Sequence, residues 1–215
     1  MFTLESTSSG GNTELIKQLT HYTIGTHYGF DQDWYPDFAM NKGGCAATVA
    51  AESCLLFKKC FGIDTLYPYD AENVTFDDFN RFAMTIKPYI RPRIGGVDRL
   101  SIYINGFGKY LRDCGETRIS MEGFPGDASE ADAKETLIAQ IDFGLPVPFL
   151  LLAHQDQTLY DFIWHWFLLN GYDRDGESLR VKAATFGEWQ WLDFDQLWNT
   201  GKDKKGGMIL YRLST

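Results

Sequence analysis

Residues 43–62 read GGCAATVAAESCLLFKKCFG and predict one long, buried helix. Small or apolar side chains occupy most positions from Cys45 to Leu56, so the helix is apolar on nearly every side. A helix with that pattern lies in the interior of a protein rather than on its surface. Gly62 marks its end, where glycine commonly closes a helix. We therefore expect a buried helix that begins at Cys45 to be the centre of the fold.

The rest of the first half also favours helices. Residues 12–25 suit a helix, and further helices are expected to begin at Thr75, at about Val97 and at Ser129. Thr75 and Ser129 are of the type that caps a helix start, and Gly144 suits the end of the last helix.

The second half changes to strand-like segments. Residues 146–153 (PVPFLLLA) and 163–172 (IWHWFLLNGY) are continuous apolar runs of strand length. Asp175 and Gly176 predict a hairpin turn from which the chain returns as a third strand. The third strand and two more are expected at residues 179–186, 188–192 and 207–213.

Helices followed by strands predict an α+β protein rather than alternating βαβ units. The chain of 215 residues is long enough for one well-buried domain, or for two lobes that share a cleft. We expect a single domain over residues 1–215. Its helical lobe would cover about residues 12–144 and its sheet lobe about residues 145–215.

Composition excludes several classes of function. The formal charge of −9 argues against a nucleic-acid partner, because the phosphates would be repelled over most of the surface. No stretch approaches the ~20 apolar residues that a membrane span needs, and the N-terminus lacks the pattern of a secretory signal. We therefore expect a cytoplasmic protein without membrane insertion.

The cysteines indicate free thiols. Cys45 and Cys54 would lie roughly 13 Å apart along the expected helix, beyond the reach of a disulfide bond. Free thiols are typical of a reducing compartment. No CxxC or CxxH pair is present, and Asp31, Asp33 and Asp37 lack the Gly and distal Glu of an EF-hand loop. We expect neither a metal nor a cofactor.

Cys45 is the first candidate for chemistry because it opens the central helix directly after two glycines. The unpaired N–H groups and the dipole at a helix N-terminus favour an anion, so we expect a lowered thiol pKa there. Small neighbours would leave the sulfur approachable. The alternative is that Cys45 only packs the start of the helix, as buried free cysteines often do.

His165 is the best partner for a thiolate among the four histidines. It lies between Trp164 and Trp166 at the start of an apolar strand, where an imidazole serves either a structural hydrogen bond or catalysis. A Cys that opens a helix, followed 120 positions later (165 − 45) by a His that opens a strand, has the order found in papain-like enzymes.

Three segments resemble bacterial papain-like peptidases, and are most similar to the branch that includes the bacteriocin-leader-processing (double-glycine) peptidases. Residues 41–51 (NKGGCAATVAA) resemble the nucleophile helix, and residues 164–173 (WHWFLLNGYD) resemble the segment of His, apolar strand and Gly-Tyr-Asp. Residues 185–189 (TFGEW) resemble the stretch after the third catalytic residue. The resemblance implies a papain-like two-lobe fold and a cysteine peptidase that acts on a peptide or a small amide through Cys45 and His165.

The resemblance also implies an oxyanion hole made by the Cys45 N–H and a side-chain amide upstream. Family members usually carry a Gln there, a little further from the Cys than Asn41 is. Asn41 is the nearest amide and our candidate. The alternative is that Asn41 is a turn residue before the two glycines.

The family places an Asn or Asp across the hairpin from the catalytic His, where it orients the imidazole. If residues 175–176 form a two-residue turn, His165 faces roughly position 186, and the candidates run from Ala183 to Glu188. Ala183 and Ala184 occupy the most natural positions and cannot supply the group. Thr185, Glu188, a backbone carbonyl or a water is left to orient His165.

Two other functions stay open. Because of the two alanines, the chain can be a papain-like pseudoenzyme that binds a peptide or partner in its cleft. The same Cys–His pair can also serve an acyltransferase or amidase that acts on a small metabolite. A narrow pocket rather than an open groove would indicate the latter.

Overall fold

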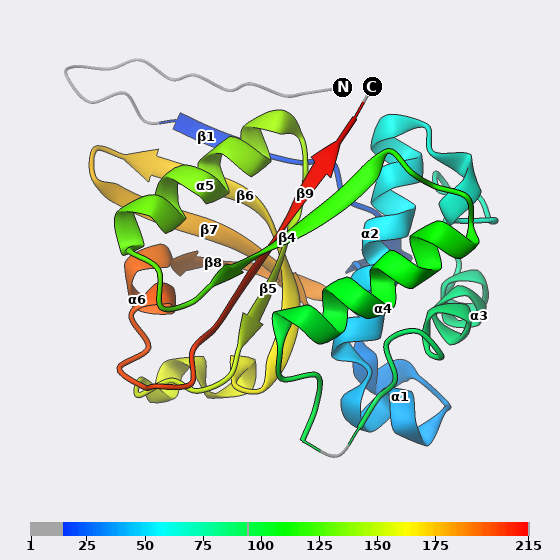
Figure 1. Ribbon diagram of the computed structural model, residues 1–215, viewed down its shortest axis with the longest axis horizontal. Coiled ribbons are helices and arrows are strands. Elements are labelled where there is room, and N and C mark those ends of the chain that lie inside the picture. Colours follow the sequence, from blue (N-terminus) through cyan, green and yellow to red (C-terminus); the bar gives the residue numbers. More distant parts are fainter. Residues whose placement is uncertain (1–14, 94, 215) are drawn as a thin grey trace.

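An antiparallel sheet of seven strands forms the centre of the computed structural model, which describes residues 15–93 and 95–214 (Figure 1). The sheet contains β1 (Leu15–Gln18), β4 (Ile119–Pro125), β5 (Val147–Leu151), β6 (His165–Asp175), β7 (Ser178–Thr185), β8 (Glu188–Asp193) and β9 (Gly206–Leu213). Its order is β4–β9–β5–β6–β7–β8, with β1 paired to the far part of β6. A separate small hairpin consists of β2 (Thr23–Ile24) and β3 (His27–Tyr28).

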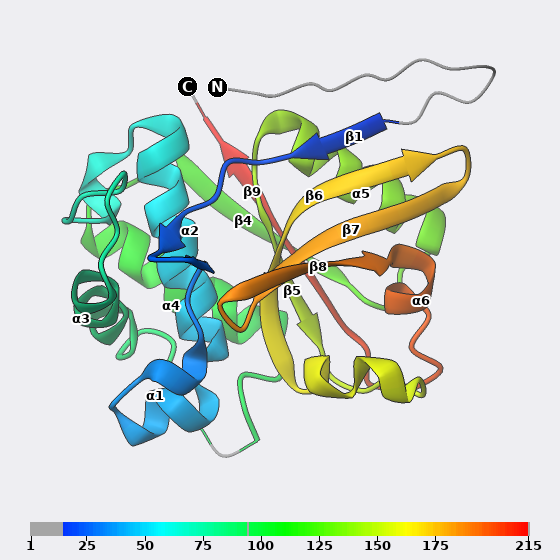
Figure 2. The same ribbon diagram turned by 180° about the vertical axis from the view of Figure 1, so that it is seen from behind.

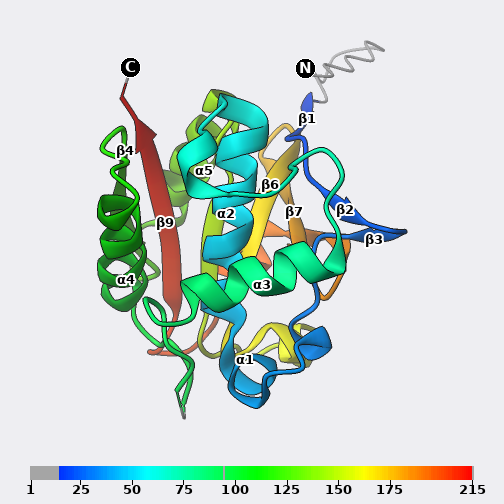
Figure 3. The same ribbon diagram turned by 90° about the vertical axis from the view of Figure 1, so that its right-hand side faces the viewer.

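Helices cover both faces of this sheet. The α-helices are α1 (Phe38–Gly43), α2 (Cys45–Phe61), α3 (Phe76–Ile86), α4 (Leu100–Asp113), α5 (Glu130–Phe143) and α6 (Phe194–Trp198). Three short 3₁₀ helices are η1 (Gln32–Trp34), η2 (Asp64–Leu66) and η3 (Gln157–Phe162). Figure 3 shows α2 and α3 on one side of the sheet and α5 on the other. The chain is thus a mixed α+β protein, as predicted.

The alternation of side chains along β6 builds two hydrophobic cores. Trp166 and Leu168 point toward the core that contains α2, α3 and α4. Phe167 and Leu169 point toward the core that contains α5 and α6. Since successive side chains of a strand face opposite sides, a strand buried on both faces reads as a continuous apolar run, which is how this one reads.

The predicted helix ends are confirmed for three helices. α2 begins at Cys45 and is closed by Gly62, which follows its last residue and adopts the left-handed conformation. The Thr75 side chain accepts a hydrogen bond from the Asp78 N–H at the start of α3. The Ser129 side chain likewise accepts a hydrogen bond from the Asp132 N–H at the start of α5, and Gly144 closes that helix. Each signal acts within one turn of chain, so the sequence alone could show it.

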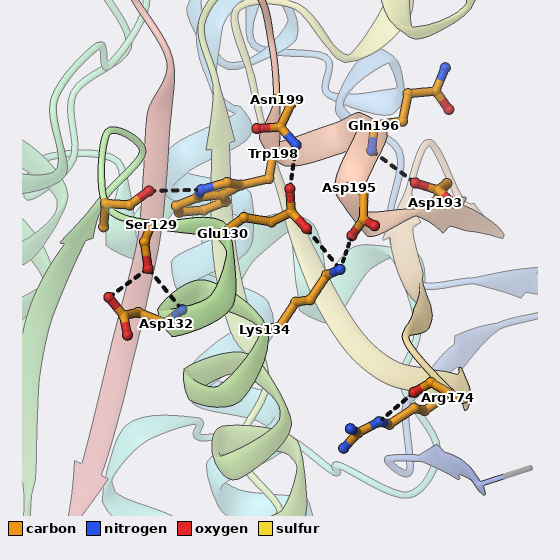
Figure 4. Close-up of polar contacts among 12 residues, drawn as sticks. Ser129, Glu130, Asp132, Lys134, Arg174, Asp193, Asp195, Gln196, Trp198 and Asn199 are labelled. Atoms are coloured by element: carbon orange, nitrogen blue, oxygen red, sulfur yellow. Dashed lines mark hydrogen bonds and ion pairs between the residues drawn. The ribbon is translucent and has the colours of Figure 1, made fainter. Parts of the chain in front are cut away.

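Polar contacts attach α6 to α5 (Figure 4). Lys134 forms an ion pair with Glu130 at 2.8 Å and a second one with Asp195. The Asn199 side-chain amide donates to Glu130, and the Trp198 indole N–H donates to a backbone carbonyl at 3.1 Å. These contacts fix α6, and with it the end of β8, against the face of the sheet opposite α2.

The predicted helix over residues 12–25 is wrong wherever the structure describes it; positions 12–14 lie outside the described residues. Leu15–Gln18 pairs instead with Gly171–Arg174 of β6, and Lys17 Nζ donates to the Asp142 carbonyl at 2.9 Å. The exposed edge of a long strand offers backbone partners that a local helical pattern does not reveal.

Three smaller differences between the predicted and the observed elements also come from tertiary contacts. β4 was not predicted, and it pairs along its length with β9. α4 begins at Leu100 rather than Val97, whose carbonyl accepts the Trp166 indole N–H at 2.6 Å. In the β6–β7 hairpin Asp175 pairs with Ser178, so the turn is one position later than predicted. No described helix combines the length and the apolar character that crossing a membrane requires.

Candidate active site

Cys45 is the first residue of α2, and the chain reaches it through a tight junction with α1. Gly44 closes α1, with its N–H donating to the Met40 carbonyl at 2.9 Å, and also precedes the first turn of α2. A Cβ at Gly44 would lie only 2.5 Å from that carbonyl oxygen, which explains why a glycine occupies the junction. Cys45 is buried, with 6% of its surface exposed.

His165 is the first residue of β6, as predicted for the base. Its Nε2 atom lies 2.7 Å from the Thr185 hydroxyl oxygen on the neighbouring strand β7. Its ring stacks on Phe186, with centroids 4.7 Å apart and planes inclined by 12°. The ring is therefore held from two sides, and Nδ1 has no hydrogen-bond partner in the part of the chain that the structure describes.

The two predicted residues face one small cavity of about 10 Å³, close to the size of a single water molecule. No direct hydrogen bond joins the thiol and the imidazole within the described part of the chain. The cavity is lined by Phe30, Gln32, Cys45, Thr48, Val49, Glu52, His165, Trp166, Phe167, Ala184 and Thr185. A helix and a strand that are far apart in sequence thus bring a thiol and an imidazole to the same small cavity.

Burial sets the protonation of this pair. It raises the pKa of the Cys45 thiol, although the backbone amides of Trp166, Ala46 and Cys45 itself oppose the shift. Burial also lowers the pKa of His165 to about 4. The predicted lowering of the thiol pKa is therefore wrong for this closed arrangement, because loss of solvation outweighs the helix terminus. The resting pair at neutral pH is a thiol beside a neutral imidazole.

Thr185 occupies the orienting position beside His165. Ala184 pairs with Leu168 and lines the cavity, while Ala183 faces the opposite core. Glu188 begins the next strand and is exposed. Of the positions that the sequence left open, the structure brings only the Thr185 side chain into hydrogen-bond contact with the imidazole among the described residues.

Asn41 does not reach the cavity. Its side-chain amide donates to the Asp33 carbonyl at 2.7 Å, and its own carbonyl accepts a hydrogen bond from Gln32 Nε2 at 2.7 Å. Gln32 does line the cavity, and its buried Oε1 atom has no hydrogen-bond partner among the described residues. The sequence held one indication of Gln32: the resemblance implied a Gln at a position further upstream of Cys45 than Asn41.

A buried carboxyl group lies two turns after Cys45 on the same helix face. Glu52 is 4% exposed and accepts a hydrogen bond from the Tyr22 hydroxyl at 2.8 Å. Burial raises the pKa of Glu52 to about 7, against the opposing effect of that hydrogen bond and of the Phe30 N–H. The carboxyl therefore changes charge near neutral pH at the wall of the cavity.

Two residues with unusual backbone flank the His165–Thr185 contact. Trp164 and Phe186 have φ angles of 59° and 57°, and no other described non-glycine residue has a positive φ. Large side chains rarely adopt this left-handed conformation, and strain of this kind concentrates at functional sites.

The other candidates from the sequence have structural roles. The Asp31 side chain caps η1, and Asp37 caps α1 while pairing with Lys87 at 2.7 Å. No group of three potential metal ligands occurs among the described residues. The four cysteines are free thiols, and Cys60 lies beside a cavity of about 390 Å³ at the other end of α2.

Comparisons of the sequence with models of protein families and with curated proteins find no match. The site is therefore defined by its geometry: a thiol at a helix start, an imidazole at a strand start, and a threonine hydroxyl and a glutamine amide beside them.

Proposed function

We propose that the chain is a papain-like cysteine hydrolase that cleaves an amide bond of a peptide through Cys45 and His165. The observation that carries the proposal is the shared cavity, into which α2 brings the thiol and β6 brings the imidazole. The two-lobe arrangement of papain-like enzymes follows as part of the same proposal.

The proton moves from the thiol to the imidazole. Because His165 Nε2 contacts the Thr185 hydroxyl, Nδ1 accepts the Cys45 proton as the thiolate attacks the substrate carbonyl carbon. The C–N bond then breaks, and Nδ1–H passes the proton to the leaving amine. Water, deprotonated by the same nitrogen, hydrolyses the thioester and restores the thiol. The imidazole is unprotonated at neutral pH, as this step requires, although its lowered pKa makes it a weak base.

The oxyanion is stabilised by the N-terminal end of α2 and by Gln32. Gln32 Nε2 carries two hydrogens, of which one is bound to the Asn41 carbonyl, so the other is available for the developing charge. This assignment replaces Asn41 by Gln32 as the amide donor.

The first experiment is alkylation by iodoacetamide, followed residue by residue with mass spectrometry from pH 5 to 10. Cys60 is the internal reference because it is exposed and lies at the opposite end of α2. We expect Cys45 to react at least tenfold more slowly at pH 7 in His165→Ala, because its proton acceptor is gone. Cys60 should react equally in both proteins.

Equal Cys45 rates in the wild type and in His165→Ala would refute the coupled pair. A folded protein is required in both cases, which the unchanged Cys60 rate and the circular dichroism spectrum establish.

A binding protein without catalysis is the second candidate. The raised thiol pKa and the threonine in place of an Asn or Asp favour it. Such a protein would leave p-nitrophenyl acetate unhydrolysed while binding peptide. The narrow cavity favours the third candidate, transfer to a small metabolite, which would give the acyl enzyme but prefer a small amine to water as acceptor.

A further inference from the structure

A cleft of about 310 Å³ lies between α1 and the segment that leads from α3 to α4. Lys42 and Gly43 line it from α1, three and two positions before Cys45. Arg93 lines it from the opposite wall. The remaining lining residues are Phe38, Ala39, Pro92, Gly95 and Gly96.

The cleft adjoins the strand that carries the imidazole. A Cβ at Gly96 would lie 4.0 Å from the Trp164 ring, immediately before His165. One position further, the Val97 carbonyl holds the Trp166 indole N–H at 2.6 Å, immediately after His165. Figure 2 shows α1, this segment and the start of β6 together at the lower end of the molecule. The cleft is thus walled by chain that leads directly into Cys45 on one side, and it adjoins Trp164, the residue before His165, on the other.

The charge of the cleft is positive, in contrast to the whole chain. Lys42 and Arg93 are the charged residues that line it, and neither forms an ion pair with a described residue. Asp37 beside them is already paired with Lys87. Lys204 adds a third cation, with Nζ 5.6 Å from the centre of the Trp164 ring. Unpaired cations gathered in one place of a chain of charge −9 indicate an anionic ligand.

Two exposed aromatic rings lie in or next to the cleft: Phe38 lines it, and the Trp164 ring lies beside Gly96. Phe38 is 78% exposed and Trp164 is 44% exposed, although most large apolar side chains of the described chain are buried. Exposed aromatic side chains next to unpaired cations are typical of a surface that binds a partner.

We propose that this cleft binds an acidic stretch of the substrate peptide, with Asp or Glu side chains next to the bond that Cys45 attacks. The inference rests on the proposed hydrolase function and names its substrate class. Arg93 and Lys42 pair with the carboxylates, and the two rings pack against the flanking apolar residues. A basic peptide is excluded by the same charges.

The test measures binding to Cys45→Ala, which separates recognition from chemistry. The probes are three fluorescein-labelled octapeptides with the same apolar flanks and a central pair of Asp-Asp, Asn-Asn or Lys-Lys, followed by fluorescence anisotropy. We expect the Asp-Asp peptide to bind tightest and to weaken as salt rises. Lys42→Glu and Arg93→Glu should each weaken it roughly fivefold without changing Asn-Asn binding.

The matched control is Arg174→Glu, which makes the same change of charge nine residues along β6 from His165, roughly 30 Å away. It should leave binding unchanged. Equal affinities for Asp-Asp and Asn-Asn, or an equal loss in Arg174→Glu, would overturn the inference.

Measuring hydrolysis of the three peptides by the wild type distinguishes the hydrolase proposal from the acidic-cleft proposal. Tight, charge-selective binding without cleavage of any of the peptides refutes the hydrolase and supports the acidic cleft. Cleavage that depends on Cys45 and proceeds equally with all three peptides refutes the acidic cleft and supports the hydrolase.

Discussion

The Thr185 hydroxyl on β7 lies 2.7 Å from His165 Nε2 on β6, so the contact joins the two strands of one hairpin. A hydroxyl accepts the Nε2–H bond as an amide oxygen does, so it can hold the ring in the tautomer with Nδ1 free. It carries no negative charge, and nothing in that contact raises the pKa of His165 against the effect of burial. The imidazole is thus oriented but stays a weak base.

Removal of this hydroxyl should slow acylation. Thr185→Val keeps the shape of the side chain, and we expect the burst of p-nitrophenolate from p-nitrophenyl acetate to slow about tenfold. Thr185→Ser retains the hydroxyl and should stay within about twofold of the wild type. Equal rates in the valine and serine variants would show that the contact does not orient the base.

Gln32 and Asn41 should differ sharply in their effect on rate. Gln32→Ala removes an oxyanion donor and should lower the rate of acylation about 100-fold. Asn41→Ala removes only the hydrogen bond to the Asp33 carbonyl, so it should change the rate little. Stopped-flow kinetics with p-nitrophenyl acetate measures both. A larger loss in Asn41→Ala than in Gln32→Ala would restore Asn41 as the donor.

Glu52 should make stability depend on pH. Its folded pKa of about 7 lies above its ordinary value of 4.5, so the folded state retains the proton more strongly than the unfolded state. The resulting stabilisation is complete below about pH 4.5 and is lost as the pH rises through 7. We expect the free energy of unfolding of the wild type, relative to Glu52→Gln, to fall by about 3 kcal/mol over that range.

Urea unfolding of both proteins at each pH measures this difference. Glu177→Gln is the matched control for the substitution itself, because Glu177 is exposed and does not line the cavity. A difference between wild type and Glu52→Gln that is constant from pH 4.5 to 7 would contradict the prediction.

The α1–α2 junction should not tolerate a larger side chain. Gly44→Ala would place Cβ 2.5 Å from the Met40 carbonyl oxygen and 2.9 Å from Met40 Cα, both backbone atoms. We expect a loss of about 1–3 kcal/mol in the free energy of unfolding. Gly108→Ala in α4 meets its nearest atom at 3.4 Å, on a flexible arginine, and should be neutral or stabilising. Thermal melts of the two variants measure this difference in stability.

Local signals explain what the sequence could predict. Gly62 marked the end of α2, Thr75 the start of α3, and Ser129 and Gly144 the two ends of α5. A Cys at a helix start and a His at a strand start marked the cavity. Each of these depends on neighbours within a few positions, or on a residue type that is unusual in its surroundings.

Long-range contacts explain the features that the sequence could not predict. Leu15–Gln18 is a strand because β6 offers it an edge, and β4 is a strand because β9 does. Gln32 enters the cavity because η1 and α1 fold the chain back, so that a residue 13 positions before Cys45 comes beside it. The thiol pKa was mispredicted for the same reason, since burial is a property of the whole fold.

The left-handed backbone of Trp164 and Phe186 has a consequence for how this protein can change. In a regular strand the pleat decides which way each side chain points. A left-handed residue interrupts this regular alternation. One such residue lies immediately before His165 and the other immediately after Thr185. His165 and Thr185 are the terminal residues of β6 and β7, so the pleat directs their side chains and the left-handed residues mark where each strand begins or ends. A change at Trp164 or Phe186 that removes the left-handed conformation would alter where these strands begin and end, and with them the contact between the imidazole and the hydroxyl.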